Sequence, residues 1–168
     1  LSLHDALPIS VVGRDVAVSI RSQDADGVVF DVQGRRAYRA LGSKMAGVHQ
    51  AMNAAVAIAM AEDLETFGFV LTEEAVARGV AEVSWPARFE ILRRDPTVVV
   101  DCAHTRESAA AFVAAFTAVF SGRKATLIFG TSSDKDVPAI ARELVPIAER
   151  VVLVRADHPR ALDWSVAD

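Results

Sequence analysis

The hydrophobic and polar positions of residues 15–41 follow the two-residue period of short β-strands. Turn signals separate the runs: Asp24-Ala25-Asp26-Gly27 after the first run and Gln33-Gly34 after the second. This pattern predicts an antiparallel meander. Its three strands are residues 16–20, residues 28–32 and a third run through Tyr38 and Leu41.

Two helices are predicted after the meander. Apolar residues recur at helical spacing across residues 47–67, and Gly68 ends this helix because glycine readily adopts a left-handed backbone. Thr72 is a good N-cap for a second helix that runs to about Glu82. Pro86 prevents its continuation.

Beyond Trp85 the pattern changes to alternating strands and helices, which is typical of a parallel sheet with crossover helices. Asp136 is the expected N-cap of the last helix, with Pro138 near its start. We predict an α/β fold, a Rossmann-like, mostly parallel sheet with flanking helices, preceded by the meander and its two helices. The expected strands are residues 89–92, 98–100, 125–129 and 151–154, and the expected helices are residues 107–120 and 137–150.

Composition narrows the class of protein. Hydrophobic residues make up 52% and charged residues 24% of the chain, so it can bury a core and remain soluble. The net charge of −4 argues against nucleic-acid binding, which usually needs a basic stripe. The apolar-rich stretch 109–120 is too short to span a bilayer. A lone cysteine, Cys102, favours a reducing compartment, so we expect a cytoplasmic protein without a membrane segment.

The two ends of the chain are unusual. Residues 1–10 contain Ala-Leu-Pro-Ile, which matches the translated end of a common sequencing adapter, and we interpret this segment as non-native. The chain stops at Asp168 without a closing strand, so an internal piece of a longer protein is expected. A domain boundary is predicted near residues 83–85, which gives domains of residues 11–83 and 84–168.

Candidate chemistry begins with Arg88 and Asp101. Asp101 follows the apolar run 98–100, and ligands of open α/β sheets bind beyond the carboxyl ends of the strands. An aspartate there can accept hydrogen bonds from ribose hydroxyls, and an arginine can bind phosphate oxygens. The alternatives are a surface Arg88 paired with Glu90 and an Asp101 that caps a loop.

The first long helix opens with three polar residues, His49, Gln50 and Asn53. His49 and Asn53 are four residues apart and therefore lie on one helix face. An asparagine amide carries both a donor and an acceptor, which suits the edge of an adenine. The alternative is a solvated capping segment.

The loop that begins with Asp101 also carries His104, three residues later. Another polar loop, residues 131–136, which includes Asp134 and Lys135, follows the strand 125–129. Together with the loop of Arg88, three such loops on one sheet edge favour a binding site over coincidence. The chain has no GxxxxGK[ST] loop, no GxGxxG and no CxxC, so no phosphate loop, metal ligand or catalytic residue is assigned.

Taken in order, four motifs resemble the folylpolyglutamate synthase/dihydrofolate synthase family of the ATP-dependent Mur ligases. The family pattern has G-x-H-Q-x-x-N-A-A, W-P-G-R-F-E, D-G-A-H-N-P and a D-K-D loop. The chain reads GVHQAMNAA, WPARFE, DCAHTRES and SSDKD, with HPRA at residues 158–161. Departures from the pattern are Ala87, Cys102, Thr105 and Arg106.

The resemblance implies roles for these residues. ATP lies between two domains in this family, so residues 11–83 correspond to the end of the ATP-binding domain and residues 84–168 to a truncated glutamate ligase domain. It implies that Asn53, Arg88 and Asp101 contact ATP and that His104 lies near the incoming glutamate. Further candidates are His49, Gln50, Asp134 and Lys135.

The implied reaction is ATP-dependent ligation of L-glutamate to folate or dihydropteroate through an acyl phosphate, by a monomer that uses Mg²⁺ held outside this chain. The chain alone is expected to be inactive because it lacks a phosphate loop. One alternative is another Mur-type ligase that builds a peptidoglycan precursor, although HQ in the helix motif and RFE after Trp85 favour the folate branch. A second alternative is a non-catalytic nucleotide-binding module, which the departures support.

Overall fold

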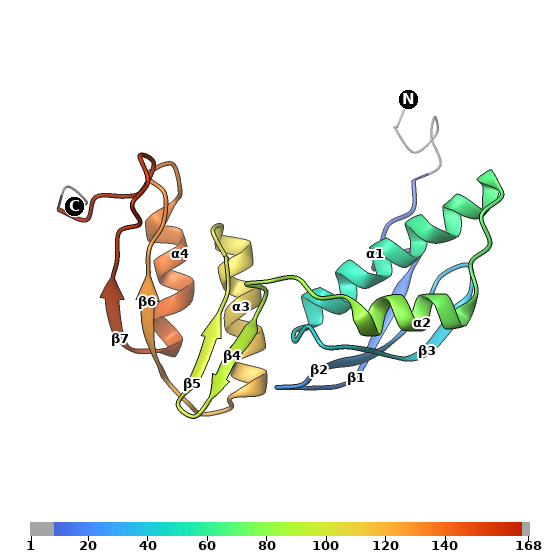
Figure 1. The fold of residues 1–168 in the computed structure, drawn as a ribbon, viewed down its shortest axis with the longest axis horizontal. Helices are drawn as coiled ribbons and strands as arrows, with labels where there is room; N and C mark the ends of the chain where they lie inside the picture. The colour runs from blue at the N-terminus through green and yellow to red at the C-terminus, as the bar shows by residue number, and fades with distance from the viewer. Residues whose placement is uncertain (1–8, 166–168) are drawn as a thin grey trace. The chain divides into compact units, whose positions relative to one another are not determined.

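The computed structural model describes residues 9–165, in two compact units that meet in sequence at Val99 and Val100 (Figure 1). Apart from residues 9 and 10, the segment interpreted as non-native lies outside the described residues. Within residues 9–165, no helix is both long and apolar enough to cross a membrane.

The first unit begins with the predicted meander. Strands β1 (Ala17–Asp24), β2 (Gly27–Gln33) and β3 (Ala37–Ser43) form an antiparallel sheet in that order, as expected. Helices α1 (Val48–Leu64) and α2 (Glu73–Glu82) cover one face of this sheet (Figure 1). The core between the layers is built from β2 side chains and small or branched helix residues, chiefly Val28, Phe30, Val32, Ala51, Ala55, Ile58, Val76 and Val80.

The helix ends of the first unit confirm the local signals. A short 3₁₀ turn, η2 (Glu65–Phe67), follows α1, and Gly68 closes it in the left-handed conformation with φ of 89°. The hydroxyl of Thr72 accepts a hydrogen bond from the Ala75 N–H at 3.1 Å and caps α2. The Thr72 hydroxyl thus satisfies a backbone N–H at the start of α2, and the Gly68 N–H satisfies the Glu65 carbonyl at the end of η2.

Asp31 stabilises an irregularity between β2 and β3. The strand register shifts between Phe30 and Val32, and Ala40 on the facing strand takes a left-handed φ of 52°. The Asp31 carboxylate accepts two hydrogen bonds from Arg21, at 2.7 and 2.9 Å, and one from the Ala40 N–H at 2.7 Å. These bonds, those from Arg21 above all, lower the pKa of Asp31 to about 2.

This pKa predicts a pH dependence of stability. Because the folded pKa lies below the ordinary value of 3.8, the contribution of Asp31 is complete at higher pH and is lost as the pH falls from about 4 through about 2. Urea unfolding of the wild type and of Asp31→Asn should therefore show a wild-type advantage at pH 7 that disappears below pH 2. A difference that stays constant from pH 7 to below pH 2 would contradict this role.

Strands β4 (Glu90–Arg94) and β5 (Thr97–Val100) pair in a two-stranded sheet, close to the predicted positions. In the second unit, β6 (Ala125–Phe129) and β7 (Ala148–Leu153) run parallel, with α4 (Val137–Leu144) between them in the chain. Helix α3 (Arg106–Val119) contacts α4, and Arg106 Nε donates to Glu143 at 3.0 Å. The α/β prediction is confirmed.

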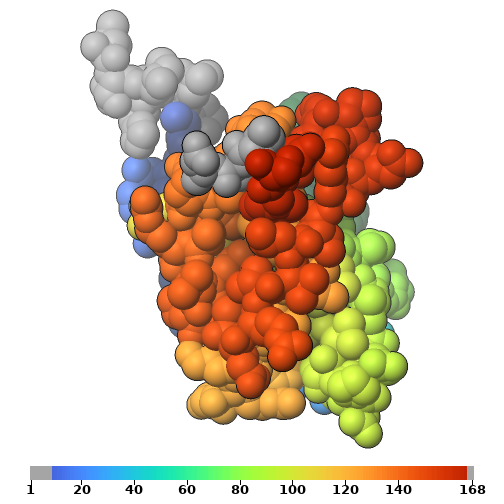
Figure 2. All heavy atoms as spheres, turned by 90° about the vertical axis from the view of Figure 1, so that its left-hand side faces the viewer, coloured from blue at the N-terminus to red at the C-terminus, as the bar shows by residue number. Residues whose placement is uncertain are grey.

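One expectation was wrong. The helix predicted for residues 137–150 ends at Leu144, a 3₁₀ turn η3 (Val145–Ile147) follows, and β7 begins at Ala148. Pro146 accounts for the early end, because it has no N–H to continue the hydrogen-bond ladder of the α-helix, although Val145 before it keeps helical dihedrals. The strand and the segment after it are exposed, and they form much of the orange and red surface in Figure 2.

Candidate functional site

His49, Gln50 and Asn53 form a chain of hydrogen bonds in the first turns of α1. The Gln50 side chain is buried, and its Nε2 lies 3.1 Å from His49 Nε2. Asn53 Nδ2 donates to Gln50 Oε1 at 3.4 Å. As an amide N–H only donates, His49 Nε2 accepts in this arrangement. Gln50 therefore links the two outer residues and orients the amide of Asn53, which is itself exposed.

Arg88 lies in a turn of unusual backbone geometry. Its neighbours Ala87 and Phe89 both have left-handed φ values, 56° and 48°. The Phe89 side chain is buried, and Glu90 Oε2 accepts a hydrogen bond from the Ala87 N–H at 2.8 Å. The turn is thus held from both sides of Arg88, by a buried ring and by a carboxylate, and Arg88 itself is half-buried.

Ala87 stands where the resembling family has glycine, and its backbone geometry suits glycine. A left-handed conformation costs an L-residue about 1–2 kcal/mol, whereas glycine adds roughly 0.5–1 kcal/mol of unfolded-state entropy. Ala87→Gly should therefore raise the free energy of unfolding by about 0.5–1 kcal/mol, measured as the urea midpoint. Ala77→Gly, at an exposed position of α2, is the matched control and should lower it by about 1 kcal/mol. Equal losses in both variants would contradict strain at Ala87.

Asp101 begins the loop that follows β5. It is half-buried, and its Oδ1 accepts a hydrogen bond from the Ala103 N–H at 2.7 Å, which folds the loop back on itself. His104 is exposed, and its Nδ1 lies 3.0 Å from the carbonyl oxygen of Cys102. Thr105 is the N-cap of α3. Asp101 and His104 are therefore set in one short, internally bonded loop.

The D-K-D loop follows β6. Lys135 Nζ lies 3.0 Å from Asp134 Oδ2, and the Lys135 ammonium, by its hydrogen bond, holds the pKa of Asp134 below its ordinary value. Asp136 caps α4 as expected, since its Oδ1 accepts from the Ala139 N–H at 3.1 Å. Asp134 is exposed and Lys135 half-buried, so this ion pair borders solvent at the carboxyl end of the strand.

The segment after β7 docks on the D-K-D loop, a contact that sequence reasoning missed. The Ser133 N–H donates to the Arg160 carbonyl at 2.9 Å, and the Leu162 N–H donates to the Thr131 carbonyl at 2.8 Å. From the sequence, residues 158–161 are indicated only as a motif. The available signal was that β6 and β7 were both expected in a parallel sheet, whose strands end at one edge.

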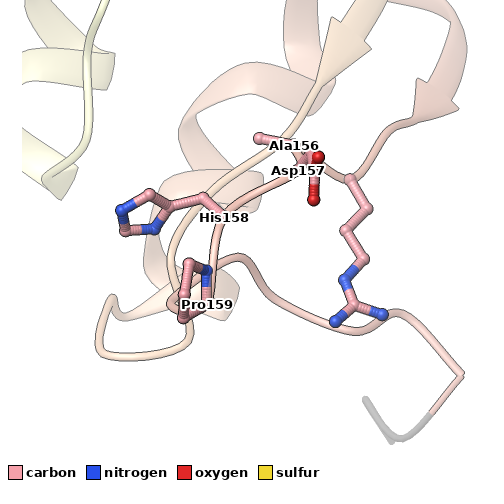
Figure 3. Close-up of a pocket in the computed structure, with 5 residues that line it drawn as sticks. Ala156, Asp157, His158 and Pro159 are labelled. Atoms are coloured by element: carbon pink, nitrogen blue, oxygen red, sulfur yellow. The ribbon is translucent and has the colours of Figure 1, made fainter.

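A hollow of about 440 Å³ opens beside the same segment, and Figure 3 shows the His158 ring projecting away from Asp157. Every residue around it is exposed. Arg155, a potential anion-binding group there, is already engaged by Asp163 at 2.9 Å. Because the hollow is open to solvent and its arginine is already paired, it does not form an enclosed binding site. Its lining residues are Arg155, Ala156, Asp157, His158 and Pro159.

The expected site residues divide between the two units. The first unit contributes the α1 group, which is His49, Gln50 and Asn53, together with Arg88. The second unit contributes Asp101, His104 and the ion pair of the D-K-D loop. A single cleft lined by Asn53, Arg88 and Asp101 stays a prediction. Within residues 9–165, no group of three or more histidine, cysteine, aspartate or glutamate side chains could hold a metal ion.

Comparison with known proteins gives a consistent family signal. Residues 87–167 match the family described as "Mur ligase, glutamate ligase domain". The chain is 34% identical over 157 residues to the dihydrofolate synthase/folylpolyglutamate synthase of Mycobacterium tuberculosis, covering 92% of this chain and 31% of that protein. The chain thus spans about a third of this relative's length, and the predicted boundary near residues 83–85 stays a prediction.

Solved structures of folylpolyglutamate synthases are also similar to this chain. The M. tuberculosis folylpolyglutamate synthase complexed with ADP superposes with a TM-score of 0.83 at 34% identity, over 92% of this chain and 34% of that one. A complex described as FPGS-AMPPCP-folate gives a TM-score of 0.77 at 28% identity, over 84% of this chain and 35% of that one. The likeness therefore covers both units, each with its own group of candidate residues.

Proposed function

This chain belongs to the folylpolyglutamate synthase/dihydrofolate synthase family of Mur ligases, and we propose that the protein ligates L-glutamate to folate or dihydropteroate at the expense of ATP. The observation that carries the proposal is the Asp101–His104 loop. It places a carboxylate and an imidazole after a strand end, in the D-x-A-H order of the family, within a chain that superposes on an ADP-bound relative.

We propose that these residues bind the nucleotide, and that His104, by the family resemblance, lies near the incoming glutamate. We propose that Asp101 accepts hydrogen bonds from the ribose hydroxyls and that Arg88 binds phosphate oxygens. Asn53, oriented by Gln50, offers an amide to the adenine edge. His49 supports Gln50, and Lys135 with Asp134 offers a charged rim to the same ligand.

The proposed reaction has two steps. A carboxylate oxygen of the folate or dihydropteroate substrate attacks the γ-phosphorus of ATP, which forms an acyl phosphate and releases ADP. The glutamate amine then attacks the acyl carbon, the amide bond forms, and inorganic phosphate leaves with the bonding electron pair. In this scheme the present residues bind and orient, which is where much of the rate of such reactions originates.

Mg²⁺ is proposed as a cofactor from the family resemblance. The described residues do not fit a magnesium cage, because they contain no cluster of three potential acidic, histidine or cysteine ligands. No step is therefore assigned to metal held by this chain. We also propose, from the family resemblance, a monomer with small-molecule substrates. The net charge of −4 supports the proposal that it has no nucleic-acid partner, and the lone Cys102 supports a cytoplasmic location.

The decisive experiment supplies the full-length purified protein with ATP, Mg²⁺ and labelled L-glutamate, and offers folate and dihydropteroate in separate reactions. The expected result is a glutamylated product in the mass spectrum with one phosphate released per glutamate added. Turnover only with a peptidoglycan precursor would favour the other Mur-type ligases. Binding of ATP without any ligation would favour a nucleotide-binding module and overturn the proposal.

A further inference from the structure

The Ser108 hydroxyl is the centre of the loop that carries His104. Its Oγ accepts hydrogen bonds from two backbone N–H groups, His104 at 3.0 Å and Thr105 at 2.9 Å. It also lies 3.0 Å from the Thr105 carbonyl oxygen, to which it donates. One hydroxyl therefore ties the first turn of α3 to the residue that precedes the helix cap.

This arrangement explains how the chain tolerates its departure from the family pattern. An Asn-Pro pair would start a helix efficiently, because asparagine is a good N-cap and proline suits the first helical position. Thr105 and Arg106 stand there instead. Thr105 still caps α3, and a reciprocal pair of hydrogen bonds with Ser108 completes a capping box. The helix start is thus preserved with different residues.

Capping alone does not require the bond to His104, whose N–H lies outside the helix. This bond fixes the backbone of His104, while the carbonyl of Cys102, 3.0 Å from Nδ1, fixes its ring. A carbonyl oxygen only accepts, so Nδ1 carries the proton. In the neutral ring, Nε2 is then the nitrogen with the free lone pair. The imidazole is exposed, so this acceptor is available to a ligand.

We propose that Ser108 is a positioning residue that holds the His104 loop so that Nε2 accepts a hydrogen bond from the amino group of the incoming glutamate. The inference rests on the proposed ligase function and assigns Ser108 a part in it. Ser108 touches none of the substrates in this scheme and acts only through His104. Loss of the Ser108 hydroxyl should therefore raise the KM for glutamate and leave the KM for ATP unchanged.

Steady-state kinetics of the full-length protein test this role. Ser108→Ala should raise the KM for glutamate about tenfold, the factor that corresponds to about 1.4 kcal/mol, while the KM for ATP changes less than about twofold. Ser108→Thr keeps the hydroxyl and should restore most of the glutamate affinity. In a His104→Ala background, Ser108→Ala should have no further effect on the glutamate KM, because its route of action has been removed.

Thr105→Ala is the matched control for helix capping. It removes the N-cap hydroxyl, yet Ser108 Oγ can still accept from the His104 N–H, so stability should fall while the glutamate KM stays near that of the wild type. An active wild type whose Ser108→Ala variant keeps its glutamate KM, or a Ser108 effect that persists without His104, overturns the positioning role alone. A folded wild type that ligates glutamate to no acceptor overturns the proposed function, and the role of Ser108 with it.

Discussion

Replacing Asp101 with alanine is expected to weaken the use of ATP far more than it destabilises the fold. A lost hydrogen bond between a charged group and a ribose hydroxyl costs about 1.5–3 kcal/mol, equivalent to a ~10- to 150-fold loss in kcat/KM for ATP. Asp101 is half-buried, and its carboxylate accepts a hydrogen bond from the Ala103 N–H at 2.7 Å. Loss of that bond should lower the free energy of unfolding by about 0.5–1.5 kcal/mol.

Asp101→Asn separates the two roles of this side chain. Asparagine keeps an oxygen for the Ala103 N–H but has no negative charge, so the loop should stay near wild-type stability while the use of ATP falls. ATP kinetics and the denaturant midpoint are measured on the same preparations of both variants. If the midpoint of Asp101→Ala collapses and its folded fraction uses ATP normally, Asp101 is a structural cap and its assignment to ATP is wrong.

Gly27→Ala is expected to be the most damaging small substitution in the first unit. Gly27 has φ of 140°, and a Cβ added there would lie 1.9 Å from the carbonyl oxygen of Ser43 on the neighbouring strand. The strained backbone costs about 1–3 kcal/mol and the forced separation of packed atoms a further 1–3 kcal/mol, so a loss of about 2–6 kcal/mol is expected. Urea unfolding followed by circular dichroism measures this loss.

Gly42→Ala is the matched control in the same sheet. Gly42 faces Val29 across the β2–β3 ladder, and a Cβ added to it would meet no atom within 4 Å. Alanine costs less entropy than glycine in a strand, so this variant should be as stable as the wild type or up to about 1 kcal/mol more stable. If both variants lose similar stability, the sheet tolerates no added side chain at either position, and the clash with Ser43 is not the cause of the loss in Gly27→Ala.

Both groups of candidate residues are oriented by hydrogen bonds to near neighbours in the sequence. Asp101 and His104 are three residues apart in one loop, and the hydrogen bonds of that loop come almost entirely from neighbours in sequence. Asn53 is likewise oriented by Gln50 on the same helix turn. Motif spacing was therefore enough to nominate them, because the interactions that orient them span four residues or fewer. Their gathering around one ATP molecule stays a prediction.

Where an element was misjudged, the reason is also local. The helix that was extended to residue 150 stops at Leu144, and Pro146 was visible in the sequence as the residue that cannot continue it. By contrast, the left-handed geometry of Ala87 had no local signal of its own, since alanine rarely adopts it.

By itself, the sequence determined the meander, the helix caps at Thr72 and Asp136, the strand 125–129 and the order of the four motifs. These features depend on side-chain period and on capping groups within a few residues, which a linear chain displays directly. Only the tertiary structure decided that Arg160 docks on Ser133 and that Asp31 holds the bulge at Ala40. In each contact a backbone N–H, of Ser133 or of Ala40, finds an acceptor on a residue at least nine positions away in the sequence. Only the folded chain brings these partners together.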